Sequence, residues 1–162
     1  MAMITPRQIT RNLNGHSTEI LIQTFADRIL VLVTQKGKVG TLVQASIPDT
    51  TPLPPAPKSE HQLPQPPVAI QLTPLLGRAP SEHMQTLHAL FTAQIATIIW
   101  MHESRGSSET ARRDVVVGLA LDQSGGKDGV GLTDRERDTF QGVMSMIFVV
   151  LNDSQKDQVS MD

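Results

Sequence analysis

Arg28-Ile-Leu-Val-Leu-Val-Thr-Gln-Lys-Gly-Lys-Val-Gly-Thr-Leu-Val43 carries the pattern from which the fold can be predicted. Five apolar residues follow one another from Ile29 to Val33. A strand with one face in water alternates apolar and polar residues, whereas a strand covered on both faces is apolar throughout. The stretch therefore predicts a strand covered on both sides, followed by a turn at Lys36-Gly37-Lys38 and a second strand.

Apolar patterning and turn residues predict six strands in the whole chain, including the two in residues 28–43. They are expected near Gln8–Leu13, Thr18–Phe25, Arg28–Gln35, Val39–Ile47, Val68–Leu76 and Val115–Leu121. Asn14-Gly15 is typical of a two-residue hairpin turn, and short connections favour antiparallel neighbours. The last of these strands is apolar on both faces, as the third is.

Two amphipathic helices complete the predicted fold. The first begins near Pro80-Ser81-Glu82 and ends before Gly106, and the second follows Thr133-Asp-Arg-Glu136, which has the pattern of a capping box. Helical spacing predicts two buried faces: Met84, Leu87, His88, Phe91, Ile95 and Ile98 in the first, and Phe140, Val143, Met144, Ile147 and Leu151 in the second. We therefore expect an α+β fold, with a six-stranded antiparallel sheet and two helices on one face. Residues 1–151 are expected to form one domain, and residues 152–162 a polar tail.

A proline-rich segment interrupts this pattern between residues 48 and 67. Eight of the chain's eleven prolines lie there. Because proline fixes φ and lacks an amide donor, the segment predicts a polyproline-like loop or a disordered insertion. Pro64-Gln-Pro-Pro67 also fits the PxxP spacing that proline-reading domains bind, which leaves a recruiting role open.

Composition and charge exclude several classes of protein. The chain has 162 residues, is 39% hydrophobic and carries a net charge of −2, with no cysteine and only one Trp and four Phe. Thiol chemistry, a base-stacking surface and a membrane span are therefore not expected, and the first residues lack a signal-peptide pattern. We expect an intracellular protein, in the cytoplasm or also in the nucleus. Residues 1–47 carry five basic and two acidic side chains, and residues 114–162 carry four and nine, which is either a solvated surface or a polarised one that orients a protein partner.

No motif points to catalysis, a cofactor or a metal. Gly37-Lys-Val-Gly-Thr41 lies between two strands, so a glycine-dependent turn explains it better than a phosphate loop. The glycine-rich stretch 124–131 has Asp128 where a phosphate loop has Ser or Thr. The five histidines, His16, His61, His83, His88 and His102, show no metal-binding spacing. His88 lies on an apolar helix face and is expected to be a satisfied core or interface histidine.

The two strands that are apolar on both faces predict a protein partner. Two helices cover one side of the sheet, and either Leu30 and Leu32 or their neighbours, with alternate residues of 115–121 such as Val116 and Gly118, face the other side. An apolar face of this size is a liability in a monomer, so we expect it to stack on the sheet of a second chain.

Residues 25–43, Phe-Ala-Asp-Arg-Ile-Leu-Val-Leu-Val-Thr-Gln-Lys-Gly-Lys-Val-Gly-Thr-Leu-Val, resemble the hairpin of the proteasome assembly chaperone 3 family. That family has Phe, a short turn, Ile-Leu-Val-Leu-Val-Thr-Gln, one variable residue, Gly-Lys, one variable residue and Gly-Thr-Leu-Val. Every fixed position is met. The later segments, Leu75-Leu-Gly77, the helix after it and Val115-Val-Val-Gly-Leu-Ala-Leu-Asp122, agree mainly in pattern, while the segment 48–67 and the tail are longer than the family's.

The resemblance implies a non-catalytic chaperone of the proteasome core particle. Members of the family pair with a related fourth assembly chaperone by stacking two sheets, and the pair supports the ring of α-type subunits. Leu30, Leu32, Val116 and Gly118 are then candidates for the partner contact, and Lys36, Gly37 and Lys38 for contact with an α-type subunit. A homodimer in isolation stays open. The alternative is a dimeric scaffold or adaptor that recruits partners through its proline-rich loop.

Overall fold

The structure is a computed structural model that describes residues 5–35, 37, 39–55, 57–59, 62–105, 112–122 and 131–159, with side chains described up to residue 153. Its strands are β1 (Arg7–Leu13), β2 (His16–Thr24), β3 (Arg28–Thr34), β4 (Thr41–Ser46), β5 (Gln71–Leu76) and β6 (Asp114–Ala120). Its helices are α1 (Glu82–Ser104) and α2 (Asp134–Val159). The predicted α+β class with six strands and two helices is confirmed within these ranges. Residues 152–159, expected as a polar tail, continue α2 as helix.

The sheet is mixed rather than antiparallel, which corrects the sequence-based expectation. Its strand order is β1-β2-β3-β6-β4-β5. β3 and β6 run parallel, and the other four neighbouring pairs are antiparallel. β6 lies between β3 and β4, because a strand that is apolar on both faces is best buried at the centre of a sheet.

The connection between β3 and β4 is therefore not a hairpin. The Gln35 amide donates to the Ala120 carbonyl at 2.9 Å, and the Gly40 amide donates to the Leu119 carbonyl at 3.3 Å. Gln35 and Gly40 thus bond to the end of β6 from both sides. The predicted hairpin at Asn14-Gly15 is confirmed, with φ of 52° and 83°, the values that a two-residue turn of this kind needs.

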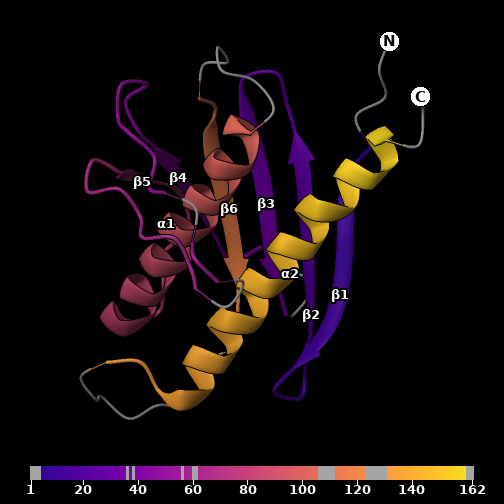
Figure 1. The fold of residues 1–162 in the computed structure, drawn as a ribbon. Coiled ribbons are helices and arrows are strands. Elements are labelled where there is room, and N and C mark those ends of the chain that lie inside the picture. The colour runs from indigo at the N-terminus through magenta and orange to yellow at the C-terminus, as the bar shows by residue number, and fades with distance from the viewer. Residues whose placement is uncertain are drawn as a thin grey trace.

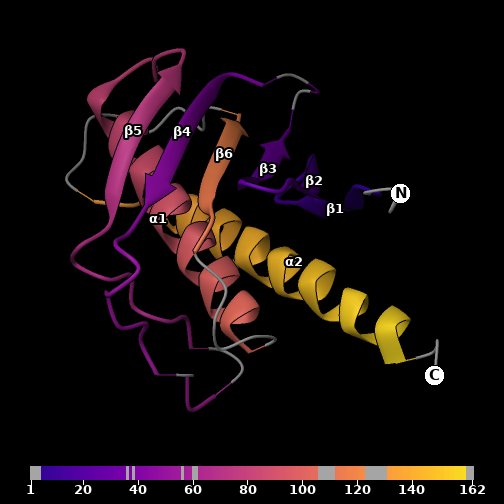
Figure 2. The same cartoon turned by 90° about the horizontal axis from the view of Figure 1, so that it is seen from above.

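Both helices lie on the same face of the sheet. α2 crosses β1 and β2, and α1 lies over β6 and β4 (Figure 1). Seen from above, the opposite side of the sheet has no described element over it (Figure 2). Among the described ranges, neither helix combines the length and apolar content needed to cross a bilayer.

The core lies between the helices and the inner face of the sheet. Phe91 of α1 meets Phe140 of α2 edge to face, with ring centroids 5.1 Å apart. Trp100 is almost fully buried and donates its indole N–H to the Arg113 carbonyl at 2.8 Å. The predicted buried faces of both helices are confirmed: every member is buried except Phe140, which is partly buried against the core.

The proline-rich segment packs against α1. Leu53 and Leu63 lie against the core cluster, and the buried Gln94 amide donates to the Pro64 carbonyl at 2.8 Å. This packing explains why α1 is buried almost all round between Phe91 and Met101, although one amphipathic face was predicted. Residues 48–67 are therefore part of the packed structure in their described portion.

Candidate functional site

The side of the sheet away from the helices is the candidate functional site, here called the open face. Along β3, Ile29, Val31 and Val33 are buried beneath the helices, while Leu30 and Leu32 point to the other side and stay half-buried. This settles which of the alternating residues face outward. The strand has no polar side because one of its faces packs beneath the helices and the other forms part of the open face.

Four residues predicted as partner contacts lie together on this face. Leu30 is the register partner of Val116, and Leu32 is the register partner of Gly118, across the parallel pair β3–β6. Val116 is only 5% exposed although no described element covers it, because its neighbours on either side shelter it. Their position is as predicted, and their role in binding stays a prediction.

The structure adds apolar residues that the sequence reasoning missed. Leu21 pairs with Leu32, Leu42 pairs with Gly118, and Leu76 pairs with Leu42. One register row thus crosses five neighbouring strands, with a register shift between β4 and β5 next to Leu42, and we call it the apolar stripe: Leu21, Leu32, Gly118, Leu42 and Leu76. Leu76 is 61% exposed, and Val39, beside the stripe, is 42% exposed.

Gly118 is the position over which side chains from neighbouring segments meet. A Cβ atom at this glycine would lie 2.6 Å from Leu32 Cδ2, 3.0 Å from Leu42 Cδ2 and 3.1 Å from Val39 Cγ1. The side chains of three different segments therefore fold over one strand position, because that position has no side chain of its own. The result is a continuous apolar surface across β3, β6 and β4.

Polar groups border the stripe. Gln44 of β4 donates from its amide to the Asp114 carboxylate at 3.1 Å, next to Val116. Glu19 lies one register row beyond Leu21, opposite Thr34. Arg28 faces the same side and binds Asp27 through Nε and a terminal nitrogen at 3.2 and 3.0 Å.

The predicted contact for an α-type subunit falls mostly outside the described residues. Gly37 is exposed in the connection between β3 and β4, with a positive φ of 65°. Lys36 and Lys38 are outside the described residues. Gly37 is not part of the apolar stripe.

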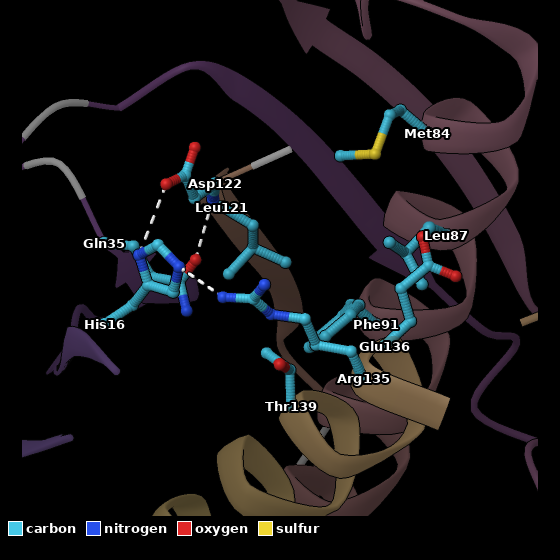
Figure 3. A pocket seen from close by; sticks show the side chains of 10 residues that line it. All are labelled: His16, Gln35, Met84, Leu87, Phe91, Leu121, Asp122, Arg135, Glu136 and Thr139. Carbon is cyan, nitrogen blue, oxygen red and sulfur yellow. Dashed lines mark hydrogen bonds and ion pairs between the residues drawn. The ribbon is translucent and has the colours of Figure 1, made fainter. Parts of the chain in front are cut away.

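A cavity of about 30 Å³, lined by polar and apolar side chains, lies on the helix side between β2, the end of β6, α1 and the start of α2. Figure 3 shows the His16 ring between Asp122 and Arg135. Arg135 donates to His16 Nε2 at 2.8 Å, which leaves the ring proton on Nδ1 for the Asp122 carboxylate at 3.2 Å. The cavity holds at most one or two waters, and its polar groups bind one another. The contacts of His16 with Asp122 and Arg135 link the start of α2 to the sheet.

The start of α2 is also bound to α1. The predicted capping box is present: the Glu136 amide donates to Thr133 Oγ1 at 3.1 Å, and Glu136 Oε2 accepts from the Thr133 amide at 2.9 Å. The other carboxylate oxygen meets His83 Nε2 at 2.7 Å. Burial alone would raise the pKa of Glu136, but the hydrogen bonds from Thr133 and His83 and the charge of His83 hold that pKa below its usual value.

His88 is a satisfied core histidine, as predicted. Its Nδ1 lies 3.1 Å from Thr41 Oγ1, which links α1 to β4, and burial lowers the pKa of the imidazole. Both residues line a groove of about 780 Å³ between α1 and the inner side of β4 and β5. Within the described ranges, no three His, Cys, Asp or Glu side chains gather as metal ligands would.

The PxxP stretch is only partly accessible to a proline-reading domain. Pro64 is buried, and its carbonyl is taken by Gln94. A proline-reading domain needs both prolines of the motif on an accessible face. The arrangement therefore counts against recruitment through this stretch. The glycine-rich candidate at 124–131 lies almost wholly outside the described residues.

No protein-family model matches the chain, and no curated protein matches its sequence. Among solved structures, the chain is similar to one described as "Crystal Structure of a Novel Chaperone Complex for Yeast 20S Proteasome Assembly". The TM-score is 0.46 and the identity 13%, over 89% of this chain and 99% of that chain. The description applies to that yeast complex. The fold of this chain stands on the register and packing given above.

Proposed function

We propose that this protein is a non-catalytic chaperone that promotes assembly of the proteasome core particle. The observation that carries the proposal is the segment 25–43, which meets every fixed position of the assembly-chaperone sequence pattern. In the structure this segment forms β3 and the connection to β4, and it supplies Leu30 and Leu32 to the open face. The residues that carry the resemblance are thus also the residues that build the candidate interface.

The open face is proposed to bind a related assembly chaperone, the fourth of the family, by stacking of two sheets. An apolar surface that crosses five strands is larger than the scattered apolar residues of ordinary monomer surfaces. Two twisted sheets pack face to face at a spacing of about 10 Å, with their inward side chains interdigitated. The stripe and the pair Leu30–Val116 are suited to such a contact, because Leu30, Leu32 and Leu42 are half-buried and Val116 is buried before a partner arrives.

The α-type subunits of the core-particle ring are the proposed clients, reached in the cytoplasm or the nucleus. Gly37, in the connection between β3 and β4, is exposed in the folded chain. Lys36 and Lys38 in this connection are the proposed contacts. The burial of Pro64 makes the adaptor alternative the weaker proposal.

The test is a purification of the tagged chain from its native cell, with quantification of proteasome subunits. We expect α-type subunits and one related chaperone, without the β-type subunits of the finished particle. The Leu32→Asp variant is the matched comparison, because Leu32 is half-buried on the open face and its replacement spares the helix-covered core. Recovery of no α-type subunit with the wild-type chain would contradict the proposal.

A further inference from the structure

Two carboxylates stand on the open face beside the apolar stripe. Glu19 of β2 lies opposite Thr34, and Asp114 of β6 lies two positions before Val116 on the same side of the strand. Both side chains are half-buried before any partner binds. These are the acidic groups that a stacked sheet would remove from water.

Neither carboxylate is joined to a cation among the described residues. Asp114 accepts one hydrogen bond, from the neutral amide of Gln44. Arg28 is its register neighbour on β3, but the guanidinium binds Asp27 instead. The ion pair Asp27–Arg28 is neutral as a unit, so it leaves the charge of the neighbouring Asp114 without an ion-pair partner among the described residues.

A partner that covers the stripe must therefore bring cations to the two carboxylates. A carboxylate that is moved out of water is destabilising unless a cation meets it. A second copy of this chain would bring the same two carboxylates, and like charges brought together across an interface disfavour it. A sheet that presents Lys or Arg at this surface supplies the missing partners.

Building on the proposed function, we infer that Glu19 and Asp114 select a partner whose facing sheet carries cations, in preference to a second copy of this chain. The apolar stripe provides the contact area, and the two carboxylates determine which partner binds more tightly. Both act in the folded chain without contact to the helix-covered core.

The probe is a variant of the chain itself, Glu19→Lys with Asp114→Lys, which keeps the apolar stripe and reverses both charges. Mixed with the wild-type chain at about 20 mM salt, it should form mixed dimers about tenfold tighter than either chain forms alone. The preference should fall at about 0.5 M salt, where charges are screened. Sedimentation equilibrium and native mass spectrometry measure both quantities. Asp138→Lys, on the exposed side of α2, is the control and should show no preference.

Statistical mixing, or no mixed dimer at about 100 μM protein, would overturn the inference. Leu32→Asp separates this failure from failure of the proposed dimer. If Leu32→Asp abolishes association while the charge variants mix statistically, the open face is the interface and only the selection by charge is wrong. If Leu32→Asp leaves association unchanged, the open face is not the interface, and both the inference and the proposed mode of pairing are wrong.

Discussion

Leu32 and Leu42 lie on strands that are not neighbours, yet their side chains reach the same space above Gly118 of the strand between them. Their Cδ2 atoms lie 2.6 and 3.0 Å from the position that a Cβ of residue 118 would occupy. The glycine thus allows the apolar stripe to be continuous from β3 to β4. Its effect is on the outer surface, since the inner side of β6 packs against α1 through Val117 and its neighbours.

Replacing Gly118 should change the open face in a graded way. In Gly118→Ala the Leu32 terminus can swing aside, so we expect little loss of stability and weaker association. In Gly118→Val, Leu32, Leu42 and Val39 must all move, which should cost about 1–3 kcal/mol. Urea unfolding and sedimentation equilibrium measure the two effects. Unchanged association of both variants would show that the partner does not contact this surface.

Reversing the charge of the connection between β3 and β4 should weaken capture of the client. In Lys36→Glu with Lys38→Glu, we expect less α-type subunit to be recovered, while the thermal unfolding and the dimer stay as in the wild-type chain. The matched control is Lys58→Glu with Arg78→Glu, which reverses two exposed charges elsewhere. Equal recovery with both double variants would remove residues 36–38 from the client contact.

Gln94 should stabilise the protein through the proline-rich segment. Gln94→Ala removes the donor to the buried Pro64 carbonyl, and an unpaired buried acceptor costs about 1–3 kcal/mol. Gln85→Ala, at an exposed position of the same helix, should change stability by about 0.5 kcal/mol or less. Urea midpoints of the two variants give the comparison, and equal midpoints would mean that the segment is not held by this contact.

Acid should destabilise the fold in part through His88. Burial lowers the pKa of His88 in the folded state below the unfolded value of about 6.5. Above the unfolded pKa both states are neutral and the contribution is constant. As the pH falls from about 6.5 toward the folded pKa, the unfolded state binds the proton first, so stability decreases by up to about 1.4 kcal/mol per pH unit.

The check is guanidinium unfolding of the wild-type chain and of His88→Gln between about pH 8 and pH 5. We expect the free energy of unfolding of the wild-type chain to fall more steeply with acid than that of the variant. The difference between the two curves isolates His88 from the other histidines. Parallel curves would contradict a lowered pKa for His88.

The sequence predicted which residues share a face better than it predicted which strands are neighbours. The two-residue repeat of a strand correctly put Leu30 with Leu32, and Val116 with Gly118, on one face, and the structure decided that this face lies away from the helices. The local pattern also gave the Asn14-Gly15 turn and the capping box at Thr133. Each of these features depends on residues within a few positions of one another.

Features that join distant segments were missed for a physical reason. The short connection after β3 suggested a hairpin, but β6, more than 70 positions further along the chain, takes the place beside β3. Leu21, Leu42 and Leu76 belong to the apolar stripe only because of this strand order and register. The contact of His83 with Glu136 likewise needs the packing of α1 beside α2. Contacts between distant segments leave no recognisable pattern in the local sequence.

The burial of Leu42 in the assembled complex is the decisive test of the open face as the partner interface. The chain has no cysteine, so Leu42→Cys on the open face and Ser145→Cys on the exposed side of α2 each introduce one thiol. The rate of maleimide labelling is measured for each variant, free and in the complex purified from the native cell. We expect the thiol of Leu42→Cys to be protected in the complex and that of Ser145→Cys to react as in the free chain. Equally fast labelling of Leu42→Cys in the free chain and in the complex would contradict the open face as the partner interface.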